Sequence, residues 1–235
     1  MPNPAQPARL VVAKMPLTEY SRALDIQQGL VQEKIRGFPD DVLLVLEHPD
    51  TITLGTRGEV SDLLTSQEEL AHRKIALHRV DRGGRATYHG PGQVVCYPIV
   101  DLRWMALSAR TYVENLEEVI IRTLGLFGVV GCRRQGAPGV WTSPREKVAS
   151  IGVKIRRRIT SHGFSLNVNV DRGAARWIVS CGMPDIVQVN LADIAPNPVL
   201  TTDVAAVIPA VFAEVFQPSA VEFIEPHELP GLPHS

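Results

Sequence analysis

The chain has 235 residues, 45% of them hydrophobic and 21% charged, so it is long enough to bury a full core and we expect one domain. Its 24 basic and 25 acidic residues nearly cancel, which argues against a general nucleic-acid-binding protein with a broad basic face. Three cysteines without CxxC spacing argue against a disulfide framework or a structural zinc site and favour a reducing cytoplasm. The apolar run near the N-terminus is too short for a signal-peptide core or a membrane span, so we expect no membrane association.

Hydrophobic periodicity predicts alternating strands and helices in the first half of the chain. A helical stripe over residues 20–35 is followed by Gly37, which is typical of a helix end. Ser66 and Glu69 have the spacing of a capping box for a short helix. The expected strands are residues 10–13, 42–46, 51–55, 75–80 and 94–100. The second and third of these are close enough in sequence to predict a hairpin-like pair.

The second half adds two long helices and a hairpin. Ser108 is a candidate N-cap for a helix whose apolar stripe extends to Phe127. A second helix is expected over residues 203–216, where Pro209 would bend it or mark its start. The expected strands are residues 129–132 and 139–142 and an antiparallel hairpin over residues 147–169.

These elements predict an α/β or α+β fold with a mixed, largely antiparallel sheet flanked by helices. We expect a single catalytic domain over residues 1–235, with its core at about residues 10–217. The proline-rich tail, residues 218–235, is expected to be loosely attached.

The stretch DRGGRATYHGPGQVVCYP, residues 81–98, is the most unusual part of the sequence. Gly83, Gly84, Gly90 and Gly92 lie within it, and strand-like runs lie on both sides. Because glycine has no Cβ, the backbone of such a loop can approach a ligand closely, so we interpret it as one wall of a binding site. A strand rather than a helix follows the glycines, which disfavours dinucleotide binding.

Two residues are candidates for chemistry. Cys181 follows an apolar run and precedes a glycine, a setting typical of a displayed nucleophile, although a lone cysteine is more often a small buried hydrophobe. Cys96 and Cys132, within apolar runs, fit that second interpretation. Lys147 begins an apolar strand at the outer end of the predicted hairpin, where a lysine is more often solvated.

Three histidines and a basic run complete the candidates. His48, His89 and His162 have no metal-ligand spacing, so we expect structural hydrogen bonds and no metal. The run KIRRR, residues 154–158, predicts a solvated hairpin tip, with a docking patch for an acidic protein as the alternative.

Five segments, taken in order, resemble the lipoyl(octanoyl) transferases of the biotin and lipoate protein ligase superfamily. They are RGGRATYHGPGQVVCYP, GVWT, KVASIGVKI, HGFSLNV and SCG. The resemblance implies transfer of octanoyl from octanoyl-acyl carrier protein to a lysine of a lipoyl domain, in 2-oxoacid dehydrogenases or the glycine-cleavage H protein. It also implies a cytoplasmic enzyme that needs neither ATP nor a metal.

The resemblance assigns roles to individual residues. Cys181 matches the cysteine that carries the acyl thioester, and Lys147 matches the lysine that lowers its pKa and moves protons. Gly83, Gly84 and Gly90 are then expected to leave room for the acyl tail. The segments implied to line the acyl site contain Arg82, Gly83, Gly84, Arg85, Ala86, Thr87, Tyr88, His89, Ser150, Ile151, Gly152, Gly163, Phe164 and Ser165.

Three alternatives remain open at this point. A ligase of the same fold would use ATP, and a non-enzymatic acyl-binding module would make Cys181 and Lys147 incidental. A hydrolase with a Cys-His pair, using His89 or His162, would release free octanoate. Departures from the family pattern at Ser180, Ser165 and Ile52 are expected to affect the rim of the site and the chain-length preference more than the reaction.

Overall fold

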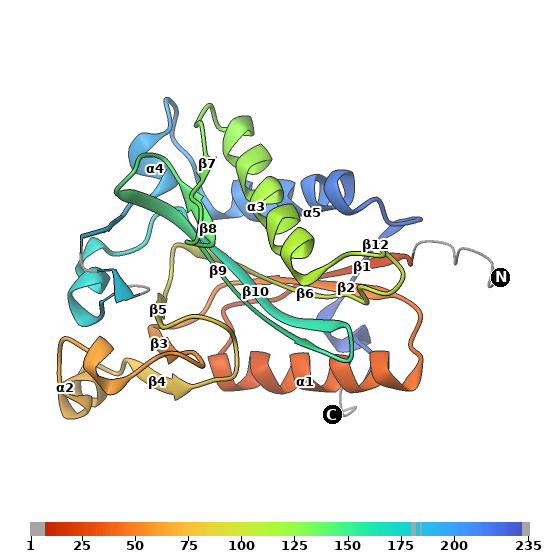
Figure 1. Cartoon of the computed structure of the whole chain (residues 1–235), viewed down its shortest axis with the longest axis horizontal. Helices are drawn as coiled ribbons and strands as arrows, with labels where there is room; N and C mark the ends of the chain where they lie inside the picture. The colour runs from red at the N-terminus through yellow and green to blue at the C-terminus, as the bar shows by residue number, and fades with distance from the viewer. Residues whose placement is uncertain (1–7, 180–181, 184, 232–235) are drawn as a thin grey trace.

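A computed structural model describes residues 8–179, 182–183 and 185–231. A large sheet forms its centre (Figure 1). In spatial order its strands are β12 (Val221–Ile224), β1 (Leu10–Lys14), β2 (Asp41–Leu46), β6 (Gln93–Ile99), β10 (Ile159–Asn167), β9 (Glu146–Arg156), β8 (Gly139–Trp141) and β7 (Cys132–Arg133), with β11 (Val187–Gln188) beside β9. The β1–β2, β1–β12 and β9–β11 pairs are parallel and the others antiparallel, which confirms a mixed, largely antiparallel sheet.

Helices cover both faces of this sheet. Helix α1 (Tyr20–Arg36) lies on one face, and α3 (Ala109–Leu126) and α5 (Thr201–Phe216) lie on the other (Figure 1). Strand β6 is buried on both sides because alternate residues point to opposite layers: Val94 and Cys96 pack toward α3 and α5, and Val95 and Tyr97 toward α1. No described helix is long and apolar enough to span a bilayer.

The helix ends follow the predicted signals. Gly37 ends α1 with a left-handed φ of 108°, and the Ser108 hydroxyl accepts a hydrogen bond from the Thr111 N–H at the start of α3. Pro209 lies inside α5 without ending it. The shorter helices are α2 (Gln67–His72), α4 (Leu191–Ile194) and the 3-10 turns η1 (Val60–Asp62), η2 (Arg172–Trp177) and η4 (Pro226–Glu228).

A second, three-stranded sheet consists of β4 (Ala76–Arg79), β3 (Thr51–Leu54) and β5 (Ala86–His89). The predicted hairpin-like pairing of residues 42–46 with 51–55 is therefore wrong, since β2 pairs with β1 and β6 while β3 pairs with β4 and β5. The reason is burial: Ile52 and Leu54 pack against Leu70 in a separate apolar cluster. Pairing with β2 would not provide that cluster.

The C-terminal tail is more firmly attached than the sequence suggests. Strand β12 extends the large sheet by pairing in parallel with β1. Leu229 is 3% exposed and packs in the apolar layer beneath α1. Residues 221–229 are thus held by a strand ladder and an apolar contact, which corrects the expectation of a loose tail.

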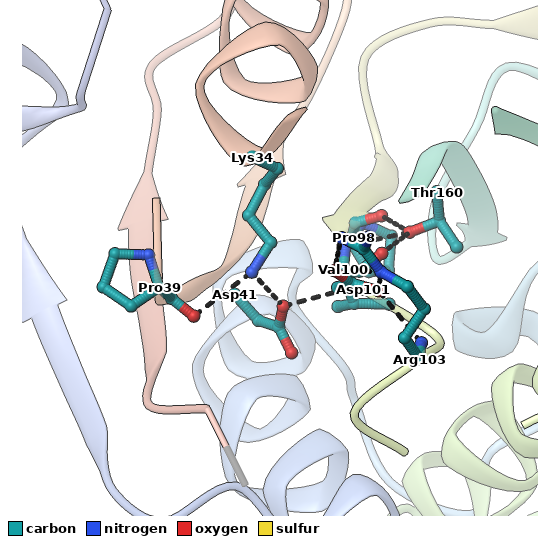
Figure 2. Close-up of polar contacts among 8 residues, drawn as sticks. All are labelled: Lys34, Pro39, Asp41, Pro98, Val100, Asp101, Arg103 and Thr160. Carbon is teal, nitrogen blue, oxygen red and sulfur yellow. Dashed lines mark hydrogen bonds and ion pairs between the residues drawn. The ribbon is translucent and has the colours of Figure 1, made fainter. Parts of the chain in front are cut away.

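A buried ion pair connects α1 to the sheet (Figure 2). The Lys34 ammonium lies 2.8 Å from a carboxylate oxygen of Asp41, and both side chains are at most 3% exposed. Lys34 also donates to the Pro39 carbonyl, and Asp41 accepts a hydrogen bond from the Asp101 N–H. Asp101 in turn binds the Arg103 guanidinium. The cluster joins the C-terminal end of α1 to β2 and to the end of β6.

Candidate active site

Two neighbouring cavities lie where the glycine-rich loop meets the β9–β10 hairpin. The outer cavity has a volume of about 360 Å³ and the inner one about 20 Å³, which is room for about one water molecule. The two linings have five residues in common, so the cavities adjoin. The shared residues are Arg82, Thr87, Ser150, Ile151 and Gly152.

Most of the predicted acyl-site residues line one or both cavities. Besides the shared five, the outer lining includes Gly83, Gly84 and Arg85, and the inner lining includes His89, Gly163, Phe164 and Ser165. Ala86 and Tyr88 do not belong to either lining. Ala86 is buried in the core of the small sheet, and the Tyr88 hydroxyl donates to Asp50 at 2.5 Å.

Lys147 is buried on the wall of the outer cavity. Its side chain is among the largest that are fully buried, which makes the solvated interpretation wrong. The ammonium donates to the Pro138 carbonyl at 3.0 Å and lies 5.1 Å from the centre of the Trp141 ring. Burial next to a carbonyl and an aromatic face gives the cation favourable electrostatic partners away from bulk water.

Cys181 lies outside the described residues. The two described residues that follow it adjoin the site: Met183 lines the outer cavity, and Gly182 approaches Arg85 closely. Gly182 has a φ of +67°, and a Cβ atom there would lie 2.4 Å from Cδ of Arg85. A residue with a side chain would be strained at this φ and would have to move the Arg85 side chain, so the glycine allows the close approach.

Arg82 holds the glycine-rich loop in shape. Its side chain is buried, and its guanidinium donates to the Thr53 carbonyl at 2.8 Å and the Thr53 hydroxyl at 2.7 Å. It also donates to the carbonyls of Arg85 at 2.9 Å and Gly83 at 3.0 Å. Because a guanidinium presents several donors in a fixed plane, these bonds fix the loop against β3.

The glycines of the loop differ in what a side chain at each position would meet. A Cβ on Gly83 would meet only the Val153 carbonyl oxygen, at an ordinary 3.4 Å, whereas Gly84 has a left-handed φ of +99°. A Cβ on Gly90 would lie 2.2 Å from the Tyr88 hydroxyl oxygen. Gly90 therefore makes room for the contact between Tyr88 and Asp50 and does not line either cavity, which corrects its predicted role.

The protonation of His89 follows from its neighbours. One end of the Gln93 side-chain amide lies next to two acceptors, the Tyr88 carbonyl and Oδ1 of Asn167. That end must therefore be the NH2 group, which can donate to both. The amide oxygen of Gln93 therefore accepts a bond of 2.7 Å from Nδ1–H of His89. Burial lowers the pKa of His89 well below its ordinary value, which leaves a neutral ring with its lone pair on Nε2.

His162 lines the inner cavity although periodicity did not single it out. Its side chain is 2% exposed, and its φ of +54° is left-handed, which is strained for a residue other than glycine. Its ring Nε2 lies 2.9 Å from a carboxylate oxygen of Asp81. Tyr20, Val95 and Tyr97 also line this cavity without having been predicted. A glycine directly after His162, inside a segment that otherwise alternates like a strand, is the local sequence feature that could have indicated the unusual backbone here.

The other predicted polar groups have structural partners. Nδ1 of His48 donates to the Thr18 carbonyl at 2.6 Å, and Nε2 pairs with the Tyr97 hydroxyl at 2.7 Å, so the expectation of structural hydrogen bonds is confirmed. Within the described ranges, no group of three or more His, Cys, Asp or Glu side chains is placed to hold a metal ion. Cys96 is buried as expected.

One surface expectation is wrong and another is confirmed. Cys132 is exposed on the short strand β7, at the edge of the sheet, rather than buried. Arg156, Arg157 and Arg158 are exposed at the turn between β9 and β10, which confirms the solvated hairpin tip. Lys154 pairs with Asp81, and the Arg158 guanidinium donates to the Leu107 carbonyl at 2.7 Å.

Comparison with known proteins is consistent with this geometry. Residues 19–213 match the family model described as the lipoyl protein ligase A/B catalytic domain. An octanoyltransferase of Acidobacterium capsulatum is 44% identical over 197 residues, covering 78% of this chain and 80% of the relative. One of Alkaliphilus metalliredigens is 36% identical over 217 residues, covering 92% and 99%. A bipartite lipoate protein ligase from Thermoplasma acidophilum, studied with its E2 lipoyl domain, has a similar fold, with a TM-score of 0.69 at 15% identity over 94% of this chain and 87% of that one.

Proposed function

Because the chain belongs to the lipoyl protein ligase A/B catalytic-domain family and is an acyltransferase, we propose that it transfers octanoyl from acyl carrier protein to a lysine of a lipoyl domain. The observation that carries this proposal is the buried Lys147 ammonium on the wall of a cavity that the glycine-rich loop also lines. Met183, two residues after Cys181, lines the same cavity and supports an acyl thioester on Cys181.

The first half-reaction uses Cys181 as a thiolate and Lys147 as an ammonium. A free thiol with a pKa of about 8.5 is about 3% ionised at pH 7, and a nearby cation that lowers this by about 1.5 units makes it about half ionised. The thiolate attacks the carbonyl carbon of the carrier's thioester, and the tetrahedral intermediate collapses with cleavage of the carrier's C–S bond. The departing thiolate takes a proton from Lys147. The products are octanoyl-Cys181 and a neutral Lys147.

The second half-reaction restores both groups. The neutral amine of the acceptor lysine attacks the thioester carbonyl, and the amine must lose a proton as the amide forms. The neutral Lys147 accepts this proton, and Cys181 leaves as a thiolate. The pair returns to its starting state, so the cycle consumes no cofactor, and we propose that neither ATP nor a metal takes part.

The outer cavity is suited to the acyl group. Gly83 and Gly84 lie on its wall, and the outer volume of about 360 Å³ continues toward the inner cavity. Burying a methylene contributes about 0.8 kcal/mol, so the seven carbons beyond the carbonyl contribute about 5 kcal/mol in a dry site. The predicted acyl-site residues that line these two cavities are therefore proposed to hold the octanoyl tail, with its end toward the inner cavity.

The partners and the cellular location belong to the same proposal. Octanoyl-acyl carrier protein is the proposed donor, and lipoyl domains of 2-oxoacid dehydrogenases and the glycine-cleavage H protein are the proposed acceptors. The archaeal relative in fold that was studied with an E2 lipoyl domain supports an acceptor of this kind. Both partners would be met in the cytoplasm.

Intact-protein mass spectrometry tests the proposal. The protein is mixed with octanoyl-acyl carrier protein without ATP, and the adduct is located by peptide mapping. We expect one octanoyl group on Cys181, its absence in Cys181→Ser, and its transfer to a lipoyl domain added afterwards. Cys132→Ser is the matched control because, of the two cysteines that the structure describes, Cys132 is the exposed one. An adduct that Cys132→Ser removes, free octanoate without transfer, or a requirement for ATP would contradict the proposal.

A further inference from the structure

A third cavity lies on the other side of His162. It has a volume of about 250 Å³ and is called the α1 cavity here because Leu24, Gln27 and Val31 of that helix form one side of it. The opposite side comes from the loop before the glycines and from the β9–β10 hairpin. Among the described residues, His162 is the one that lines both the α1 cavity and the inner cavity.

His162 is held firmly in this position. Its backbone N–H donates to Oε1 of Gln27 at 2.7 Å, and its ring Nε2 contacts Asp81 at 2.9 Å. Because a backbone N–H can only donate, the Gln27 atom that faces it must be the oxygen. Nε2 of the buried Gln27 is then left without a hydrogen-bond partner in the described part of the chain. The bond to His162 is kept although it leaves a buried donor unsatisfied.

The backbone of β10 has an unusual conformation at His162 and little space at the next residue. His162 has a left-handed φ within strand β10, although its pairing with β9 stays in register, and such a φ is unusual for a residue with a side chain. The following Gly163 has no room for a Cβ atom, which would lie 2.1 Å from the Cys96 carbonyl oxygen. Strain of this kind persists where the surrounding structure requires it and is frequent at ligand sites.

The two sides of His162 differ in polarity. On the inner side, its ring lies among the rings of Tyr20 and Tyr97, with Nδ1 3.5 Å from the Tyr20 hydroxyl. On the α1 side, the lining includes the polar or charged side chains of Lys154 and Arg156. A hydrocarbon tail that passed His162 would meet these charged groups beside the apolar side chains of Leu24 and Val31, so its burial there would be less favourable.

We propose that His162 is the wall that ends the acyl chamber, separating the inner cavity from the α1 cavity, and that it thereby limits the length of the acyl chain. The inference rests on the proposed function, in which the octanoyl tail extends from the outer cavity toward the inner one. A chain two carbons longer would have to displace the imidazole, which is held by the contact of its Nε2 with Asp81, on a backbone that is fixed by the bond to Gln27.

The substitution His162→Gly removes the wall with little risk to folding. Glycine adopts a left-handed φ readily, so the change relieves backbone strain while it deletes the ring. His162→Asn is an intermediate step, because asparagine also tolerates this conformation and has a smaller side chain. The series His, Asn, Gly thus opens the partition progressively.

The experiment compares acyl transfer to a lipoyl domain from octanoyl, decanoyl and dodecanoyl thioesters of acyl carrier protein. The measured quantity is the ratio of kcat/KM for decanoyl to that for octanoyl. One methylene in a shaped pocket changes discrimination by about tenfold or more, so we expect His162→Gly to raise this ratio by at least about tenfold and His162→Asn by less.

His48→Ala is the matched control. It removes another buried imidazole that contacts Tyr97, but His48 does not belong to the linings of these three cavities. If the decanoyl-to-octanoyl ratio of kcat/KM is unchanged in both His162 variants, or rises equally in His48→Ala, the proposal that His162 limits the chain length is wrong. If the unsubstituted protein fails to transfer octanoyl at all, the proposed function has failed instead, so the two failures are distinguishable.

Discussion

A Cβ atom on Gly139 would lie 2.6 Å from Cε of Lys147, closer than two such atoms approach in proteins. It would also lie 2.5 Å from the Ala149 carbonyl oxygen, and the φ of Gly139 is +126°. The buried lysine therefore occupies space that only a glycine at position 139 leaves open. The position of the ammonium depends on a residue eight positions earlier on the neighbouring strand β8.

Gly139→Ala is expected to lower acyl transfer by at least about 100-fold, because the added methyl displaces the proposed proton-transfer group. It should also lower the free energy of unfolding by about 1–3 kcal/mol through backbone strain. Single-turnover transfer and urea unfolding measure the two effects. Gly37→Ala is the control, with a similar φ of +108° and nothing within 4 Å. Equal activity losses in the two variants would show that strain alone is responsible.

Gly83→Val should lose transfer while staying folded. The φ of Gly83 is not left-handed, and its Cβ would make only an ordinary contact with Val153, so the added side chain is tolerated but occupies the wall of the outer cavity. Gly125→Val places the same side chain on the exposed surface of α3, with nothing within 4 Å. We expect a rise in KM for the octanoyl donor in the first variant only. Normal turnover of Gly83→Val would show that the tail lies elsewhere.

The buried histidines predict a loss of stability in mild acid. Burial lowers the pKa of His48 to about 4 from the 6.5 of an exposed histidine. Between pH 6.5 and 4, His48 is therefore protonated in the unfolded chain but neutral in the folded protein. The contribution to stability is complete above pH 6.5 and is lost as the pH falls toward 4, by about 3 kcal/mol.

His48→Asn should flatten the dependence of unfolding free energy on pH between 6.5 and 4, since the amide keeps a donor for Thr18 but does not titrate there. Urea unfolding at a series of pH values measures the slope for the variant and for the unsubstituted protein. Identical slopes in the His48 variant and the unsubstituted protein would contradict the assignment.

The buried pair of Lys34 and Asp41 predicts a non-additive effect on stability (Figure 2). Lys34→Met leaves a buried carboxylate without its cation and should cost about 3–5 kcal/mol. Adding Asp41→Asn should recover part of this loss, because the amide still accepts from the Asp101 N–H. Arg36→Met, which breaks an exposed pair with Glu33, should cost under about 1 kcal/mol. Strict additivity in the double variant would refute the coupling.

Several elements were predictable because their signals are local. The helical stripe and Gly37 locate α1, Ser108 locates the start of α3, and alternation locates the β9–β10 hairpin. In each case the information lies within a few residues of the element. The glycine-rich loop was likewise predicted as a wall, and Gly83 and Gly84 do line the outer cavity.

Other predictions failed where contacts between distant residues decide the outcome. The pairing of β3 with β4 and β5 depends on a core formed with Leu70, and the burial of Lys147 depends on the space left at Gly139. Cys132 lies in an apolar run yet is exposed, because its strand is at the edge of the sheet. Hydrophobic periodicity along one segment does not indicate which distant residues pack against that segment in the folded protein.

The sequence by itself determined the main elements, the mixed sheet and, through its motif segments, the family and most residues that line the candidate site. Only the tertiary structure decided which strands pair, that the Lys147 side chain is buried and that His162 separates two cavities. The physical reason is that hydrophobic patterning records burial along one element. A cavity wall, in contrast, arises from contacts such as that between Gln27 and His162, which are 135 positions apart in the chain.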